Sequence, residues 1–513
     1  MMNRRVFVGD LTRIAALAAV VPNDWRVKRR VPFADDPFQL GVASGDPGPD
    51  GVVLWTRLSP RPLEADGGMT AGRVAVRWEV AEDEAFSRIV KRGTATATPE
   101  LSWSVHVDVG GLRPDRWYFY RFMSGDATSE TGRTRTTPAR DAATPLRFAF
   151  VSCQHYEQGL YTAYRHLATE GVDLVAHLGD YIYETPPAAG RVRAHTGPLL
   201  MQLDDYRRRY AQYKADPYLR AAHAAAPWVV TWDDHEVSNN YAGLIAADTT
   251  LTTDVMRARR AAAYRAWWEH QPVRLPASGD WSNLSITRRM DWGTVARFSV
   301  LDTRQFRSDQ ACGDGSRVVP CGEWADPSRT MMGERQEKWL YDGLSSRASW
   351  QVLANQVMVA PFDSLAGDGE RVSMDQWSGY PVARDRLLGE IAKRAPNRTV
   401  VLTGDIHSSW VNELRSSFSA ADTPVVAAEF VGTSISSGGD GSDRNVVERV
   451  TEDNRHVMWQ NGRRGYATCT VTAAEWRTEY RTLGFVTKPD SPVTTATKWI
   501  LRNGAPGVTR DSG

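Results

Sequence analysis

Residues 173–184 read Asp-Leu-Val-Ala-His-Leu-Gly-Asp-Tyr-Ile-Tyr-Glu, an apolar run that ends in a glycine, a carboxylate and two tyrosines. The apolar run predicts a buried strand. In α/β sheets, function gathers where the strands end, because the loops there are free to vary. The stretch therefore predicts a functional carboxylate, Asp180, at the end of a strand.

Three more predicted strands, in residues 146–152, 228–232 and 399–404, end in side chains of the same kind. Each such side chain alone is commonly a helix cap or a packed residue. Packing is a poor joint explanation when they recur at four strand ends, and the pattern predicts metal-ligand chemistry. The residues that follow these three strands are Cys153, Gln154, His155, Asp233, Asp234, His235, Glu236, Asp405 and His407.

The length of 513 residues favours more than one domain. Short alternating strands with frequent turn signals in residues 38–140 predict a small all-β domain of the fibronectin or immunoglobulin kind. In residues 145–505, apolar strands alternate with helical segments, including residues 254–271 and 334–344, which predicts an α/β catalytic domain.

The amino terminus, residues 1–30, is predicted to be an export signal or extension. Arg4 and Arg5 precede a short apolar stretch, residues 14–21, in a pattern that resembles a twin-arginine signal. This predicts a periplasmic or secreted protein. A basic start followed by an ordinary surface helix is the alternative.

The overall charge is balanced, with 62 Lys and Arg against 61 Asp and Glu, a formal net charge of +1. No global field attracts nucleic acid or an anionic membrane, so we expect no stable nucleic-acid partner. No apolar segment approaches the roughly 20 residues that a transmembrane helix needs, so we expect no membrane span.

Two of the four cysteines, Cys312 and Cys321, lie in a Gly-rich segment whose turns can bring them together. A disulfide between them fits an oxidising compartment. Two reduced thiols in a surface loop are the alternative. Cys469, in an alternating strand pattern, is predicted to pack in the core.

Several motifs carry a resemblance to a known family. They resemble the metal motifs of calcineurin-like metallophosphoesterases and are similar to the PhoD-type alkaline phosphatase/phospholipase D family. Two further segments, residues 40–58 and 301–315, extend the likeness over nearly the whole chain. The motifs are VSCQ (151–154), GDYIYE (179–184), WDDHEVSNNY (232–241) and LTGDIHSSW (402–410).

The resemblance implies an α/β fold with a four-layer metallophosphoesterase sandwich, two mixed β-sheets flanked by helices, preceded by the small all-β domain. It implies a hydrolase that releases phosphate from phosphomonoesters, phosphodiesters or both by metal-activated hydroxide. Small phosphate esters or phosphodiesters are then the expected substrates. Two alternatives stay open: phospholipase D-like hydrolysis of phospholipid head groups, and a non-catalytic binding protein stabilised by metal.

Two or more close metal ions can neutralise a phosphate ester and make hydroxide available near neutral pH. Asp180 is our candidate for a bridging ligand. Anionic donors such as a phenolate from Tyr183 and a thiolate from Cys153 suit trivalent iron. The resemblance implies the same Fe³⁺ site, with His407 as its fourth ligand.

A second ion is expected to contact Asp180, Asp234 and Asp405. Such oxygen donors favour hard cations such as Ca²⁺ over Zn²⁺. The resemblance implies calcium as well, as one or two ions. Asn239 or Asn240 is a further candidate ligand, and the sequence does not decide between them.

Asp180 and His235 are the predicted catalytic residues. His235 is expected to contact a phosphoryl oxygen or to protonate the leaving alkoxide, with Asn240 as a second substrate-binding residue. A contact that only orients Asp234 is the alternative role for His235. Tyr181 is predicted to pack, and Arg304 is predicted to form an internal ion pair with Asp302.

Overall fold

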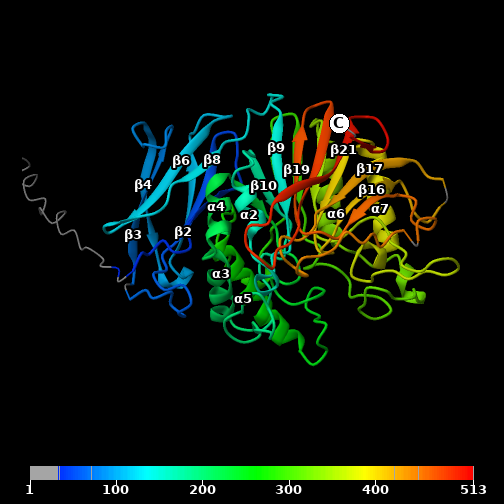
Figure 1. Ribbon diagram of the computed structural model, residues 1–513, viewed down its shortest axis with the longest axis horizontal. Helices are drawn as coiled ribbons and strands as arrows, with labels where there is room; N and C mark the ends of the chain where they lie inside the picture. The colour runs from blue at the N-terminus through cyan, green and yellow to red at the C-terminus, as the bar shows by residue number, and fades with distance from the viewer. Residues whose placement is uncertain (1–32, 34, 71, 421, 449, 512–513) are drawn as a thin grey trace, which may run out of the picture.

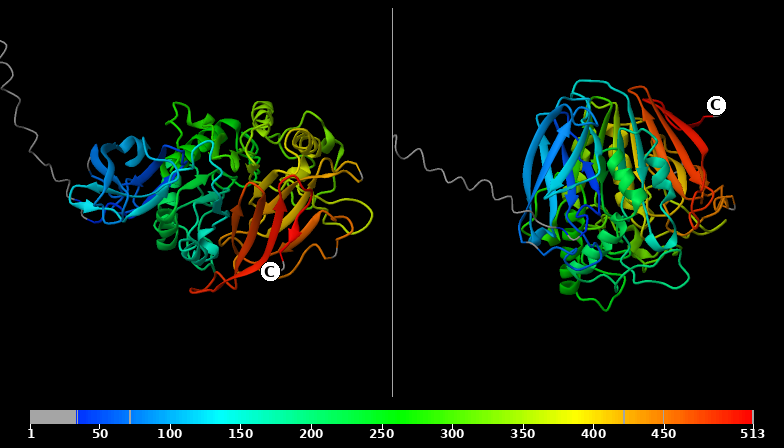
Figure 2. Two further views of the ribbon diagram at one scale, coloured as in Figure 1. Left: turned by 90° about the horizontal axis from the view of Figure 1, so that it is seen from above. Right: turned by 60° about the vertical axis from the view of Figure 1, so that its left-hand side comes forward.

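The computed structural model describes residues 33, 35–70, 72–420, 422–448 and 450–511, which form three β-sheets with helices packed around them (Figure 1). The predicted export signal lies outside the described residues. Figure 2 shows the five-stranded sheet, in blue and cyan, at one end of the molecule and the carboxyl-terminal strands, in orange and red, at the other.

The largest sheet has ten strands, and the parallel strands β9, β10 and β11 lie near its middle. On one side of them β19–β21 extend the sheet with antiparallel strands, and on the other side β1 pairs with β11. In sheet order the strands are β22 (Thr509–Arg510), β21 (Val493–Arg502), β20 (Glu475–Leu483), β19 (Gly465–Val471), β9 (Leu146–Val151), β10 (Leu174–His177), β11 (Trp228–Val230), β1 (Val42–Gly45), β2 (Gly51–Arg57) and β5 (Ser104–Gly110).

A second sheet of seven strands packs against the first. Its central strands β13, β14, β15 and β17 are parallel, and antiparallel strands lie at both edges. In sheet order the strands are β12 (Arg288–Trp292), β13 (Ala296–Val300), β14 (Trp350–Ala354), β15 (Thr399–Thr403), β17 (Val425–Val431), β16 (Ser409–Arg415) and β18 (Val457–Asn461).

The third sheet belongs to the amino-terminal part of the chain. It comprises β4 (Ile89–Ala97), β3 (Val74–Ala81), β6 (Trp117–Ser124) and β7 (Ala127–Thr128), with β8 (Gly132–Arg135) paired to β6. Its apolar face shares a core with β2 and β5, which include the buried Val52, Leu54 and Val105. The strands that oppose this sheet are therefore also part of the ten-stranded sheet. The domain limits at residues 38–140 and 145–505 stay a prediction.

The central strands read as continuous apolar runs because both faces are buried. In β9, Ala149 and Val151 face the helices α2 (Thr162–Leu167), α3 (Leu203–Lys214), α4 (Pro217–Ala225) and α5 (Thr253–His270). The alternate residues Phe148 and Phe150 face the seven-stranded sheet. The other face of that sheet packs on α6 (Glu334–Leu344) and α7 (Pro381–Arg394).

Three local predictions, the limits of two helices and the burial of Cys469, are confirmed, and the structure decides between the two alternatives for Cys312 and Cys321. Helix α6 spans residues 334–344 as predicted, and α5 begins and ends within one residue of its predicted limits. Cys312 and Cys321 form a disulfide, and Cys469 is buried in β19. Among the described helices, none is both long and apolar enough to cross a membrane.

Candidate metal centre

The parallel strands of the two large sheets bring their carboxyl ends together at one place. An isolated parallel bridge joins Ser152, after β9, to Ser434, after β17. Gly404, after β15, permits this close approach, because a Cβ atom there would lie 2.7 Å from the Ser152 hydroxyl. Loops from both sheets therefore share one site.

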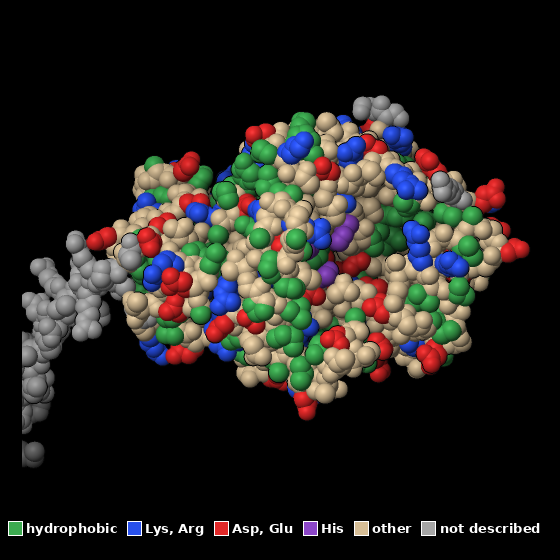
Figure 3. All heavy atoms as spheres, turned by 60° about the horizontal axis from the view of Figure 1, so that its bottom comes forward, with side chains coloured by type: hydrophobic (Ala, Val, Ile, Leu, Met, Phe, Trp, Pro, Cys, Tyr) green, Lys and Arg blue, Asp and Glu red, His purple; other side chains and the backbone are tan. Residues whose placement is uncertain are grey.

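Three groups of potential metal ligands lie in this site, and the ligand atoms within each group are all within 4.8 Å of one another. Asp180 belongs to two of the groups and Asp234 to two, so the three form one continuous series. The groups are Cys153–Asp180–His407, Asp180–Asp234–His235 and Asp233–Asp234–Asp405. In Figure 3, histidine and acidic side chains gather in a hollow on the face that lies at the bottom of Figure 1.

Tyr183 joins the first group through its phenolic oxygen. The hydroxyl donates to Asp180 Oδ2 at 2.8 Å and lies 3.0 Å from His407 Nε2. The Ser437 hydroxyl donates to it at 2.7 Å. The structure thus brings all six principal predicted ligands together. We call these six residues the strand-end cluster: Cys153, Asp180, Tyr183, Asp234, Asp405 and His407.

Four members of the cluster have left-handed backbone conformations, with φ of 59° at Cys153, 57° at Asp180, 64° at Asp405 and 54° at His407. For residues other than glycine this region is sparsely populated and costs about 1–3 kcal/mol per residue. Such strain persists where the surrounding structure fixes it, and it concentrates at functional sites. The strained backbone lowers local stability, but it places the side chains of these four predicted ligands in the site.

Glu236 fixes two of the loops to each other. Its buried carboxylate accepts backbone N–H bonds from Asp180 at 3.0 Å, Tyr181 at 2.5 Å and Asp233 at 2.7 Å. Gly179 lies beside this contact with φ of 107°, and a Cβ atom there would lie 2.5 Å from Asp233 Cβ. The two carboxylate loops therefore have a fixed separation.

His235 lies at the rim of the cluster, where its ring packs against that of Tyr183 in a tilted arrangement at a centroid distance of 4.1 Å. Its Nδ1 is 2.7 Å from Glu184 Oε2. Although burial opposes the charged ring, the carboxylates of Glu184, Asp234 and Asp180 raise the pKa of His235 well above its usual value. This side chain is thus suited to carry a proton.

The contacts of Arg304 differ from the predicted ion pair with Asp302. Asp302 does not form an ion pair with its side chain but accepts the backbone N–H of Arg304 at 3.0 Å. The guanidinium instead contacts Asp233, Asp375 at 2.9 Å and Asp405 at 2.9 Å. The predicted pair was wrong because the partners of a buried arginine are set by strands distant in sequence, which local spacing does not reveal.

Burial and crowding shift the cluster's acid groups strongly. Burial, with the charges of Asp234 and other carboxylates, raises the pKa of Asp180 well above its usual value. Burial likewise raises the pKa of Asp405 to about 6 and those of Cys153 and Tyr183 well above normal. Cations between these groups would relieve the cost of their charged forms. The donor set of carboxylates, thiol, phenol and imidazole therefore fits metal ions.

The two asparagines differ in their placement. Asn240 donates its backbone N–H to Asp234 Oδ2 at 2.6 Å, while its side-chain amide donates to Asp314 at 2.7 Å. Asn239 is exposed, and its backbone N–H donates to Glu184 at 2.8 Å. Their roles as ligand and substrate contact stay predictions. Tyr181 is buried and its hydroxyl lies 2.8 Å from His223, in agreement with the packing role.

The residues that hold the cluster were not identified from sequence as such. Glu184 ends the motif GDYIYE (179–184), and Glu236 ends the Asp-Asp-His-Glu stretch, so each had a local signal as a carboxylate beside predicted ligands. Ser437 had no such signal, and Arg304 was assigned only an ion pair with Asp302, because both residues reach the site from distant parts of the chain through the fold.

A fourth group of potential ligands, His155, Glu157 and His195, lies nearby and is buried. His195 Nδ1 is 2.9 Å from the Thr185 carbonyl oxygen and its Nε2 is 3.0 Å from the Tyr213 hydroxyl. Glu157 Oε1 accepts the backbone N–H of His195 at 2.9 Å. These atoms already have protein partners, so the group is a hydrogen-bonded support.

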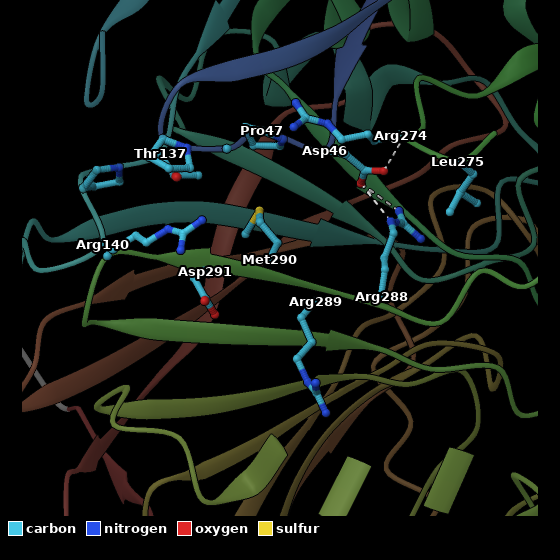
Figure 4. A pocket seen from close by; sticks show the side chains of 14 residues that line it. Asp46, Pro47, Thr137, Arg140, Arg274, Leu275, Arg288, Arg289, Met290 and Asp291 are labelled. Atoms are coloured by element: carbon cyan, nitrogen blue, oxygen red, sulfur yellow. Dashed lines mark hydrogen bonds and ion pairs between the residues drawn. The ribbon is translucent and has the colours of Figure 1, made fainter. Parts of the chain in front are cut away.

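A separate cavity of about 380 Å³ lies between the amino-terminal strands and β12 (Figure 4). Asp46 stands between Arg274 and Arg288, accepting from the Arg274 backbone N–H at 2.8 Å and from Arg288 Nε at 3.0 Å. None of its lining residues belongs to the strand-end cluster. We assign this cavity no part in the chemistry.

Comparisons with known proteins show which family this chain resembles. The family model described as PhoD-like phosphatase matches residues 148–480, and the model of the PhoD-like phosphatase N-terminal domain matches residues 25–138. Alkaline phosphatase D of Bacillus subtilis (strain 168) is 45% identical over 523 residues, covering 99% of this chain and 89% of the relative.

Two solved structures are similar as well. A structure of PhoD has a TM-score of 0.91 and 46% sequence identity, covering 94% of this chain and 93% of the other. Purple acid phosphatase PPD1 from yellow lupin (Lupinus luteus) seeds has a TM-score of 0.54 and 12% identity, covering 90% of this chain and 73% of that protein. The second similarity concerns the fold alone.

Proposed function

The chain belongs to the PhoD-like phosphatase family. We therefore infer that it is a metal-dependent phosphoesterase and that the strand-end cluster is its metal centre. The family that the motifs resemble is thereby confirmed. The observation that supports the location is the continuous series of ligand groups linked by Asp180 and Asp234. Expected substrates are phosphomonoesters, phosphodiesters or both.

For the ions, we propose Fe³⁺ held by Cys153, Asp180, Tyr183 and His407. A thiolate and a phenolate within one group favour a trivalent ion. We propose one or two Ca²⁺ ions at Asp180, Asp234 and Asp405, where carboxylate oxygens favour a hard cation. Such ions supply positive charge for the phosphoryl oxygens and a nucleophile from water near neutral pH.

The chain's own groups then position the ester and move the proton. Since Nδ1 of His235 contacts Glu184, Nε2 is the atom left to donate a proton to the departing alkoxide. Glu184 orients the ring and favours its protonated form. Arg304, with Asp233 and Asp375, keeps Asp405 in place. Asn239 or Asn240 is proposed as a further ligand or substrate contact beside Asp234.

We further propose the four-layer metallophosphoesterase sandwich, preceded by a fibronectin- or immunoglobulin-like domain. Separate apolar cores on both faces of the two large sheets support the layers. The paired arginines near the amino terminus support export to the periplasm or the medium. Hydrolysis of phospholipid head groups is the second candidate, and its test is release of head group from phosphatidylcholine vesicles.

Elemental analysis of the purified full chain tests the ion assignment. We expect iron and calcium to co-purify with the protein. A chelator should abolish the release of phosphate from p-nitrophenyl phosphate, and adding both ions back should restore it. Fully active protein that contains neither ion would overturn the proposal.

A further inference from the structure

A cavity of about 350 Å³ adjoins the strand-end cluster and shares Asp405 with it. Figure 3 shows hydrophobic side chains lining the hollow beside the histidine and acidic side chains. The walls come from five segments of the chain, around Asn240, Ser316, Phe362, Asp375 and Trp410. We call this space the Trp410 cavity.

One wall of the Trp410 cavity is apolar. The rings of Phe362 and Trp410 meet edge to face at a centroid distance of 5.0 Å, and Met358 and Ile406 extend the surface. Serine hydroxyls from Ser373 and other residues lie among these side chains. A neutral group with apolar surface and hydroxyls suits such walls.

The charged side chains that line the cavity disfavour a second anion. Its only charged lining residues are the carboxylates Asp375 and Asp405, and no lysine or arginine contributes to the described lining. Asp375 pairs with Arg304 and with Arg307 at 2.5 Å, so neither guanidinium is free for a ligand there. Beyond the proposed ions at Asp405, a second phosphate group in this space would find no cationic side chain as a partner.

Another part of the wall belongs to the loop closed by the Cys312–Cys321 disulfide. Gly315 and Ser316 line the cavity, and the Gly315 carbonyl accepts the Met374 N–H at 2.9 Å. Asp314 in the same loop accepts from the Asn240 amide. The loop is thus attached to Asn240, whose backbone N–H donates to Asp234 of the cluster, and to Met374, between two lining residues of the cavity.

His235 and Glu184 do not line this cavity. The cavity shares Asp405 with the strand-end cluster and is not lined by His235, so it offers space for one ester substituent of a phosphodiester whose phosphate lies at the cluster. We propose that the Trp410 cavity binds the uncharged ester group that stays on phosphorus, which makes the protein selective for phosphodiesters with an organic group of this kind. The proposal rests on the proposed function.

In the step concerned, a water oxygen bonds to phosphorus and the bond from phosphorus to the departing oxygen breaks. One proton of that water is lost to solvent, and the departing oxygen receives a proton as an alcohol. The retained group remains in the cavity as part of a phosphomonoester. A monoester substrate has no retained group and leaves the cavity unused.

Two substitutions test whether the cavity binds the retained ester group: one fills the cavity and the other removes part of its wall. Ser316→Trp fills it from an exposed loop position, and Phe362→Ala removes half of the aromatic pair. We measure kcat/KM for bis(p-nitrophenyl) phosphate, methyl p-nitrophenyl phosphate and p-nitrophenyl phosphate, using the metal-loaded full chain. Val319→Trp is the matched control, because Val319 is 60% exposed in the same loop and does not line the cavity.

For both variants the ratio of bis-aryl diester to monoester kcat/KM should fall about tenfold, whereas the ratio of methyl diester to monoester should change less than twofold. The control should keep both ratios. Equal losses on all three substrates, or unchanged ratios, would overturn the assignment. Wild-type protein without phosphatase activity would instead overturn the proposed function.

Discussion

Tyr183 is the residue through which the strand-end cluster is most tightly connected, since one oxygen meets Asp180, His407 and Ser437. We expect Tyr183→Phe to lower kcat for p-nitrophenyl phosphate by at least about tenfold, because the proposed metal ligand and the contacts of its oxygen with Asp180, His407 and Ser437 are lost. If iron is bound by this phenolate, the visible absorption of the protein should also disappear. Absorption spectra and steady-state kinetics measure both effects.

Tyr181→Phe is the control for this change. Tyr181 is equally buried, but its hydroxyl contacts His223 on the side away from the cluster. It should retain both the absorption and kcat within about twofold. Loss of colour in this variant and not in Tyr183→Phe would contradict the ligand assignment.

Substitution of Glu236 tests how the two carboxylate loops are held, because its carboxylate accepts hydrogen bonds from three backbone N–H groups. In Glu236→Gln an amide NH₂ replaces one acceptor oxygen, so at least one buried N–H loses its partner. We expect a loss of about 1–3 kcal/mol in the free energy of unfolding and reduced metal content. Chemical denaturation and elemental analysis provide the two measurements.

Glu429→Gln separates stability from metal binding. Glu429 in β17 is also buried and accepts the N–H groups of Val359 at 2.7 Å and Ala360 at 2.9 Å, but it belongs to none of the ligand groups. We expect similar destabilisation with normal metal content. Equal metal loss in both variants would show that Glu236 has no special link to the centre.

Among longer segments, the disulfide loop, residues 312–321, is exposed yet attached to the site through Asp314. Removing a crosslink over a loop of this length costs roughly 2–3 kcal/mol in chain entropy. We expect the double variant Cys312→Ser/Cys321→Ser to be cut by trypsin after the exposed Arg317 several-fold faster than the wild type. Mass spectrometry of the fragments over time measures the rate.

Cleavage after Arg140, an exposed residue outside the loop, is the internal reference and should not change. If the two proteins are cut after Arg317 at the same rate, the disulfide does not order the loop. In that case the wall formed by Gly315 and Ser316 must be held by its backbone contacts alone.

The sequence predicted the core strands and their functional ends because each is a local signal: an apolar run followed at once by Asp, His or Cys. It did not predict that β1, β2 and β5 join the largest sheet, since such pairing depends on residues more than a hundred positions away, as between Gly45 and Trp228. For the same reason the sequence predicted Asp302 as the ion-pair partner of Arg304, whereas the structure shows Asp233, Asp375 and Asp405.

Over the whole molecule, buried histidines should make stability sensitive to acid. Burial lowers the pKa of His456 to about 4, with Arg384 adding to the effect, whereas an unfolded histidine titrates near pH 6.5. The unfolded chain then binds more protons between these values, so stability falls as the pH drops through 6.5 and levels off below 4. For this group the loss between pH 7 and pH 5 is about 2 kcal/mol.

The measurement is the free energy of unfolding by urea at pH 7, 6 and 5. His456→Gln can still donate to the Pro361 carbonyl, which lies 2.7 Å from His456 Nε2, and it should show a shallower dependence on pH. Burial lowers the pKa of His177 to about 3, and it contributes in the same direction. If the free energy of unfolding of the variant depends on pH as steeply as that of the wild type, His456 does not contribute to the acid sensitivity.

The central claim is that distant strand ends meet to bind the metal ions that hydrolyse phosphate esters, and Asp180 is the residue shared by the first two ligand groups. The most direct measurement is phosphate release by Asp180→Asn, with circular dichroism to verify folding and Asp342→Asn, on the exposed face of α6, as the control. We predict a loss of at least about a thousandfold in kcat/KM for Asp180→Asn and none for the control. A folded Asp180→Asn protein with undiminished hydrolysis would contradict the claim.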